Sequence, residues 1–178
     1  MNPDQTILDR HESQFARILR KLASFHVQSR EASPATVRDP ARAPDKPQGL
    51  KKRVFLVEDH ALMRRSIVGA IEREPDLTVC GQAEEAAAAL GAILSLPPDI
   101  VLTDIRLKSS SGLDLIKFLR ARLPVLPIVA TTMFDVRHIE RLARAAGATG
   151  FVSKGDGPDT LIAVIRDVLK IRERDDNS

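Results

Sequence analysis

The sequence contains a single cysteine, no tryptophan and no tyrosine, and aromatic residues make up only 3% of it. One cysteine cannot form an intrachain disulfide. Cys80 lies in an apolar stretch, so we expect its thiol to be buried in the core. The scarcity of aromatic side chains argues against a protein that binds single-stranded nucleic acid by stacking bases.

Long hydrophobic runs and dense blocks of one charge are also missing. No apolar run approaches the length of a membrane-spanning helix. The N-terminus lacks the basic-then-apolar order of a signal peptide. The net charge is only +3, which favours a solvated surface over a nucleic-acid-binding patch. We therefore predict a cytoplasmic protein, with neither a membrane nor a nucleic acid as its partner.

The chain of 178 residues has room for one ordinary domain plus a tail. Residues 1–30 predict an N-terminal amphipathic helix, because apolar residues recur in the a/d pattern of heptads. We interpret this seam as a surface for homo-oligomerisation or for docking onto another helix. The alternative is an amphipathic helix that packs on its own domain or frays. The seam consists of Leu8, His11, Phe15, Ile18, Leu22 and Phe25. His11 is interpreted as a polar seam residue rather than as a phosphoaccepting histidine.

Residues 31–50 form a Pro/Ala-rich segment that we interpret as a flexible linker, because it holds four prolines and no apolar periodicity. The main domain is expected over residues 51–172, and residues 173–178 form a polar tail. Within the main domain, short apolar runs alternate with stretches of helical periodicity.

Five apolar runs predict strands, and a predicted helix follows each of them. Strand followed by helix, five times over, predicts an open parallel sheet covered by helices on both faces. The predicted strands are "VFLVE", "LTVCG", "DIVLTD", "PIVATT" and "GFVSK", and the predicted helices are Ala61–Glu74, Glu84–Leu94, Gly112–Leu123, Asp135–Ala146 and Asp159–Arg172.

Polar side chains stand at the carboxyl ends of four of these strands. Ligands of open parallel sheets bind outside these ends, so we expect the side chains to converge on one edge. They are Glu58 and Asp59 after the first strand, Asp104 on the third, Thr131 and Thr132 on the fourth and Lys154 after the fifth.

The three carboxylates would repel one another unless a divalent cation lies between them. Mg²⁺ is bound through one or two carboxylates together with a phosphate. This set predicts Mg²⁺-dependent phosphoryl chemistry, in which Lys154 and a threonine hydroxyl stabilise phosphoryl oxygens. One carboxylate would act as the nucleophile and form an aspartyl-phosphate.

With these residues in place, the chain resembles the receiver domain of bacterial two-component response regulators. The matching stretches are "VFLVEDH", "DIVLTDIRLKSSSGLDLI", "PIVATTMFD" and "AAGATGFVSKG", which cover about Lys51 to Arg172. They are most similar to receivers of transcription factors with a C-terminal helix-turn-helix. The resemblance implies an α/β, flavodoxin-like, doubly wound five-stranded parallel sheet of strand order 2-1-3-4-5.

The resemblance also implies roles for the acidic residues. Asp104 would be the phosphoacceptor and a ligand of Mg²⁺. Asp59 would ligate Mg²⁺ directly, and Glu58 would hold it through a water molecule. The backbone carbonyl of Arg106 would be a further metal ligand.

Three further residues receive roles in phosphoryl binding and switching. Thr132 and Lys154 would bind the phosphoryl group, and Phe151 would turn inward together with Thr132 on activation. For Phe151 the alternative is a plain core residue. Thr131 is a rival of Thr132, but the family's spacing to Lys154 favours Thr132, and only one of two successive strand residues faces a given side.

The sequence departs from the family at two places. Lys108 stands where the loop after the phosphoacceptor usually carries a proline. No output domain follows the last predicted helix before Ser178. We therefore expect a stand-alone receiver, not an enzyme. It would accept a phosphoryl group from a sensor histidine kinase or a histidine phosphotransfer protein and signal to a downstream protein partner or by oligomerisation.

Three alternatives remain at this point. The first is a phosphate shuttle or sink in a phosphorelay. The second is a Mg²⁺-dependent phosphohydrolase, which would need a second acid close to Asp104, whereas Ile105 and Arg106 follow it. The third is a direct DNA-binding regulator, for which no recognition-helix motif is visible.

Overall fold

A computed structural model of the protein describes residues 50–133 and 136–175. The predicted N-terminal helix, with its apolar seam, lies outside the described residues. In the described part, strands and helices alternate along the chain, in the order β1 (Lys52–Val57), α2 (Ala61–Glu72), β2 (Leu77–Ala83), α3 (Ala86–Ser95), β3 (Ile100–Asp104), α4 (Gly112–Arg122), β4 (Ile128–Thr132), α5 (Val136–Ala146), β5 (Gly150–Ser153), a 3₁₀ turn η1 (Lys154–Asp156) and α6 (Gly157–Asp175). None of these helices has both the length and the apolar character needed to cross a membrane.

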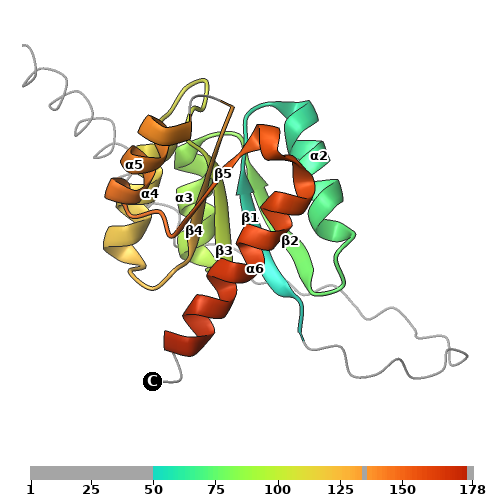
Figure 1. The fold of residues 1–178 in the computed structure, drawn as a ribbon. Coiled ribbons are helices and arrows are strands. Elements are labelled where there is room, and N and C mark those ends of the chain that lie inside the picture. The colour runs from blue at the N-terminus through green and yellow to red at the C-terminus, as the bar shows by residue number, and fades with distance from the viewer. Residues whose placement is uncertain (1–49, 134–135, 176–178) are drawn as a thin grey trace, which may run out of the picture. The chain divides into compact units, whose positions relative to one another are not determined.

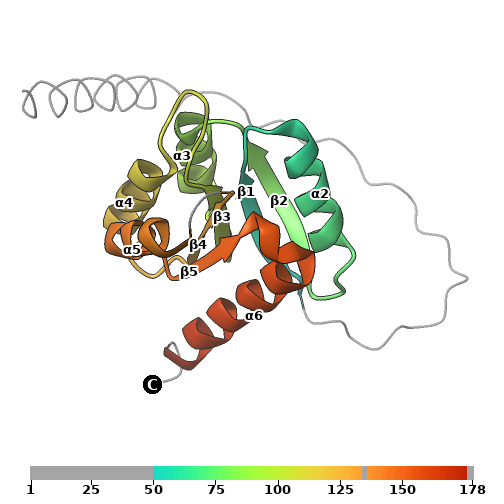
Figure 2. The same ribbon diagram turned by 45° about the horizontal axis from the view of Figure 1, so that its top comes forward.

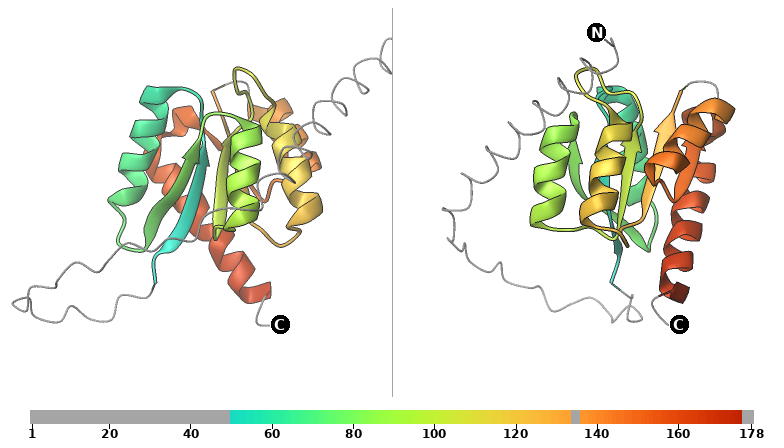
Figure 3. Two further views of the ribbon diagram at one scale, coloured as in Figure 1. Left: turned by 180° about the vertical axis from the view of Figure 1, so that it is seen from behind. Right: turned by 90° about the vertical axis from the view of Figure 1, so that its left-hand side faces the viewer.

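The five strands form one parallel sheet in the order β2-β1-β3-β4-β5, which confirms the predicted fold class. Helices α2 and α6 cover one face of this sheet, and α3, α4 and α5 cover the other (Figure 1). Figures 2 and 3 show the same two helical layers from other directions. Because all strands run the same way, their carboxyl ends meet at a single edge.

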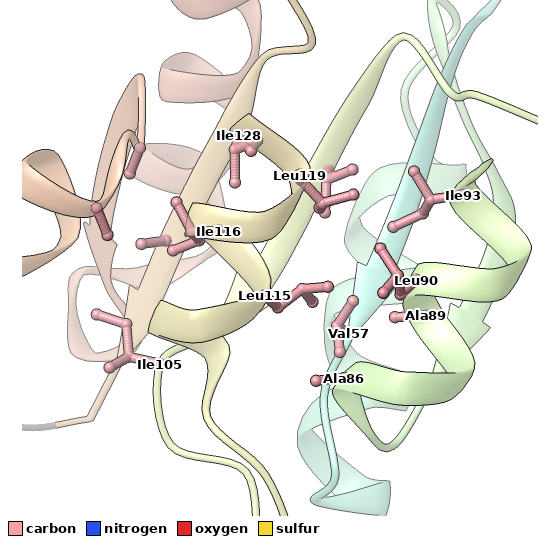
Figure 4. Close-up of a cluster of buried hydrophobic side chains, with 14 of the residues drawn as sticks. Val57, Ala86, Ala89, Leu90, Ile93, Ile105, Leu115, Ile116, Leu119 and Ile128 are labelled. Carbon is pink, nitrogen blue, oxygen red and sulfur yellow. The ribbon is translucent and has the colours of Figure 1, made fainter. Parts of the chain in front are cut away.

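Each face of the sheet has its own hydrophobic core, because successive side chains of a strand point to opposite faces. On β1, Phe55 and Val57 pack toward α3, α4 and α5, whereas Val54 and Leu56 pack toward α2 and α6. Figure 4 shows the first of these cores, in which aliphatic side chains of α3 and α4 meet the sheet. Its labelled residues are Val57, Ala86, Ala89, Leu90, Ile93, Ile105, Leu115, Ile116, Leu119 and Ile128.

The last helix extends beyond the predicted limits at both ends. It was expected over Asp159–Arg172, whereas α6 runs from Gly157 to Asp175. Asp159 therefore lies in the first turn of the helix, where a carboxylate interacts favourably with the helix dipole.

The prediction that the Cys80 thiol is buried is wrong. Val54 of β1 pairs with Val79 of β2 and Phe55 pairs with Gly81, so Cys80 is the extra residue of a β-bulge. Strand β2 is also an edge strand of the sheet. Cys80 is consequently exposed, although its apolar neighbours in the sequence suggested a core position.

Arg120 of α4 is hydrogen-bonded to the turn after α5 and to the loop that precedes β4. Its guanidinium donates to the carbonyl oxygen of Gly147 from Nε at 3.1 Å and from Nη2 at 2.7 Å, and also to the carbonyl of Pro124. Gly147 has a φ of 108°, a left-handed conformation that ends α5 and that glycine adopts without strain. Partial burial lowers the pKa of Arg120 below its usual range.

We expect Arg120→Ala to lower the free energy of unfolding by about 2 kcal/mol, because the carbonyl groups of Gly147 and Pro124 lose a charged hydrogen-bond donor. Arg122→Ala is the matched control on the same helix. The Arg122 guanidinium is exposed and lies over the ring of Phe118, 5.2 Å from its centroid. Its loss is expected to cost about 0.5 kcal/mol. Urea unfolding of both variants checks the difference, and equal losses would contradict the role given to Arg120.

Candidate functional site

Three carboxylates lie together at the carboxyl ends of β1 and β3. Glu58 and Asp59 directly follow β1, and Asp104 is the last residue of the neighbouring strand β3. One oxygen of each carboxylate lies within 4.8 Å of the others. Glu58 is 0% exposed and Asp104 is 8% exposed. The structure therefore brings together the acidic residues that the sequence placed at strand ends.

Lys154 supplies a positive charge to this cluster. It follows β5, and its Nζ lies 2.5 Å from Glu58 Oε2 and 2.5 Å from Asp104 Oδ2. The Lys154 side chain is only 5% exposed. A buried charge is tolerated when it is paired, and removing one partner of a buried pair costs about 3–5 kcal/mol. Lys154 thus compensates two buried acids at once.

The loop between β3 and α4 contributes backbone donors to the cluster. The N–H of Arg106 donates to Asp104 Oδ1 at 3.0 Å, and the N–H of Lys108 donates to Asp59 Oδ2 at 2.9 Å. The third acid, Glu58, accepts the N–H of His60 at its Oε1, 3.2 Å away. Each carboxylate is therefore oriented by the main chain.

Gly112 allows the backbone of α4 to lie against the phosphoacceptor candidate. A Cβ atom at this position would lie 1.9 Å from the carbonyl oxygen of Asp104 and 2.8 Å from its carbonyl carbon. Ser111 caps the helix at this point, because its Oγ accepts the N–H of Asp114 at 3.2 Å. The start of α4 thus fixes the end of β3.

The two threonines of β4 face different sides of the sheet. Thr131 follows Ala130 and is paired in register with Asp104. It lines a pocket of about 80 Å³ that is bounded by α2, β5 and the start of α6, and its buried Oγ1 has no hydrogen-bond partner among the described residues. Thr132 is buried one residue further along, in register with Ser153. The assignment of Thr132 to phosphoryl binding stays a prediction.

Phe151 lies on β5, two residues before the end of the strand. It is half-buried and packs against the core formed with α3, α4 and α5. This placement is compatible with both sequence interpretations, a switch residue and a core residue.

The composition of the site suits a small divalent cation. Three carboxylates face one ammonium group, so the formal charge of the cluster is negative. Mg²⁺ prefers oxygen ligands of this kind. The carboxylates of Asp59 and Asp104 could ligate it directly, with the carbonyl group of Arg106 from the adjoining loop as a further ligand.

Sequence reasoning missed two groups that shape the site. The backbone N–H of Lys108 has no signature in the sequence beyond the missing proline. The close approach of Gly112 could have been suspected from a glycine directly after Ser111, a typical helix-capping residue.

The sequence model of the response regulator receiver domain matches residues 54–166. The chain is 33% identical over 125 residues to the DNA-binding transcriptional activator DevR/DosR of Mycobacterium tuberculosis, covering 70% of this chain and 58% of that protein. It is 32% identical over 120 residues to a nitrate/nitrite response regulator homologue of Haemophilus influenzae, covering 67% and 58%. The chain thus spans somewhat more than half the length of these curated relatives.

Solved structures of response regulators are also similar to this chain. The receiver domain of the response regulator NarL from Mycobacterium tuberculosis is 29% identical with a TM-score of 0.64, covering 68% of this chain and 98% of that one. A LuxR-family response regulator from Aurantimonas is 30% identical with a TM-score of 0.65, covering 67% and 86%. Among the curated relatives, a protein-glutamate methylesterase/protein-glutamine glutaminase of Pyrococcus abyssi is 28% identical over 137 residues. The match covers 71% of this chain but only 37% of that protein. Similar domains therefore occur in proteins of different overall activity.

Gly112→Ala is expected to lower the free energy of unfolding by about 2 kcal/mol or more, because the new methyl group must displace the backbone of Asp104. Gly69→Ala in α2 is the control, since among the described residues no atom beyond its chain neighbours and the backbone of its own helix lies within 4 Å of the added Cβ. That change should stabilise the protein by about 0.5–1 kcal/mol. Thermal or urea unfolding measures the change in stability of both variants. A Gly112→Ala variant as stable as the wild type would contradict the close approach of Gly112 to Asp104.

Proposed function

The chain belongs to the response regulator receiver domain family, and on this premise we propose that it is a signalling domain that is phosphorylated on Asp104. The observation that carries this proposal is the position of Lys154, whose ammonium joins the buried carboxylates of Glu58 and Asp104. A phosphoryl group on Asp104 would lie within reach of the same ammonium. Its negative charge would be stabilised there by a buried cation.

The acidic cluster would hold Mg²⁺ in this proposal. Asp59, Asp104 and the backbone carbonyl of Arg106 would ligate it directly, and Glu58 would act through a water molecule. When bound, Mg²⁺ would neutralise charge on the phosphoryl oxygens. The buried Oε2 of Glu58 supports the assignment, because Lys154 is its ion-pair partner but no hydrogen bond of good geometry satisfies it among the described residues.

The phosphoryl donor would be a phosphohistidine of a sensor histidine kinase or of a histidine phosphotransfer protein. A carboxylate oxygen of Asp104 would attack phosphorus, the bond between phosphorus and the histidine nitrogen would break, and the donor imidazole would leave. Arg106 would hold Asp104 Oδ1 through its backbone N–H during this step. The product would be an acyl phosphate, which is hydrolysed by water.

The output would arise from the added charge at the strand ends. Thr132 would bind a phosphoryl oxygen, and Phe151 would change its packing as β4 and β5 adjust. A downstream protein partner or a change of oligomeric state would read this change. The N-terminal helix, the stand-alone arrangement and the alternative of a phosphate shuttle or sink stay predictions.

Incubation with Mg²⁺ and acetyl phosphate is expected to add a single phosphoryl group to the wild-type chain, as measured by intact mass. Asp104→Asn should show no adduct, because it lacks the carboxylate nucleophile. Asp159→Asn is the matched control, since Asp159 is an exposed acid of α6. The adduct should be lost on treatment with hydroxylamine and should not form when Mg²⁺ is chelated. An adduct that persists in Asp104→Asn would refute the assignment of the phosphoacceptor.

The two threonines are expected to behave differently. Thr132→Ala should lower the rate of phosphorylation by acetyl phosphate about tenfold or more, because a donor to the transferring group is lost. Thr131→Val should leave this rate unchanged and should raise the free energy of unfolding by about 1 kcal/mol, since it removes a buried hydroxyl without a partner among the described residues. The rates come from time courses of intact mass. The reverse pattern would assign phosphoryl binding to Thr131.

A further inference from the structure

The loop from Arg106 to Ser111 is hydrogen-bonded to both carboxylates that would ligate the cation directly. Arg106 N–H donates to Asp104 Oδ1, and Lys108 N–H donates to Asp59 Oδ2. We propose that the backbone amide of Lys108 is a positioning group of the metal site, which orients Asp59 for the cation. This inference rests on the proposed function, because it concerns the Mg²⁺ site of that function.

The hydrogen bond uses one oxygen of Asp59 and leaves the other one to the cation. Asp59 Oδ2 lies 2.9 Å from the Lys108 nitrogen, a normal length for a hydrogen bond to a carboxylate. A carboxylate whose one oxygen is fixed presents its second oxygen in a defined direction. Such outer partners orient metal ligands, and their removal typically weakens metal binding about 10–100-fold.

The loop is anchored at its other end, so the amide of Lys108 has a fixed place. Arg106 forms an isolated antiparallel bridge with Ser111. Ser110 Oγ accepts the N–H of Ala86 at 3.0 Å, where α3 begins. The preceding residue, Glu85, makes no side-chain hydrogen bond at that helix end. The loop is thus held between α3 and the acidic cluster.

Whether this donor is present depends on the residue type at position 108. Proline has no backbone N–H, so a proline at position 108 would remove the donor that Asp59 Oδ2 accepts. The lysine side chain is exposed, so the amide and the ammonium can be separated by mutation.

The test is the dissociation constant for Mg²⁺, measured by isothermal titration calorimetry on the full chain. Lys108→Ala keeps the N–H and removes the ammonium, whereas Lys108→Pro removes both. We expect Lys108→Ala to bind Mg²⁺ much like the wild type and Lys108→Pro to bind about tenfold more weakly or worse. Unfolding curves without Mg²⁺ establish that both variants are folded.

The outcomes separate this inference from the proposed function. Equal affinities of Lys108→Ala and Lys108→Pro would overturn the inference alone and leave the metal site in place. A wild-type chain that does not bind Mg²⁺ would overturn both.

Amide hydrogen exchange gives a second test that does not depend on the proline variant. In the Mg²⁺-free protein, Asp59→Ala should speed exchange of the Lys108 amide about tenfold or more, because its acceptor is lost. The Arg106 amide should keep its rate, since it donates to Asp104. An unchanged Lys108 rate would show that the hydrogen bond does not form in solution and would overturn the inference.

Discussion

The ion pairs of Lys154 with Glu58 and Asp104 are the interaction on which the arrangement of the site depends. Two carboxylates this deeply buried are tolerated because a cation lies between them. Lys154 follows β5, whereas the acids follow β1 and end β3, and β4 lies between β3 and β5. The ammonium therefore reaches the acids across the end of a strand that contributes threonines. The ammonium of Lys154 can therefore balance the two carboxylates only if β1, β3, β4 and β5 lie in this order.

The acidic side chains come from strand ends, but their orientation comes from the loops. Strands packed on both faces leave the ends of β1 and β3 little freedom, because their inner residues are fully buried. The loop between β3 and α4 adds backbone donors to Asp59 and Asp104. Gly112 then brings α4 against the carbonyl group of Asp104. The sheet edge and the loop that is hydrogen-bonded to it together form the site, as in other open parallel sheets.

The fold and the convergence of the acids were predictable, because both follow from local patterns. Apolar runs alternate with helical periodicity, and Glu58, Asp59, Asp104 and Lys154 directly follow or end such runs. The orientation of backbone groups was not predictable, since a lysine at position 108 shows that an N–H is present but not that this N–H points to Asp59. The exposure of Cys80 was missed for a related reason. The bulge shifts the pairing of β2 with β1 by one residue, and the alternation of apolar side chains in the sequence does not reveal this shift.

The bulge at Cys80 has a consequence for how copies of this domain meet one another. Strand β2 is an edge strand, and an edge strand offers unpaired backbone groups to any extended chain. A bulge twists the strand and interrupts the regular spacing of these groups, so a second strand cannot continue the ladder along its whole length. An irregular edge of this kind is one of the features by which sheets avoid edge-to-edge pairing, and here it lies on the strand that the fold leaves open.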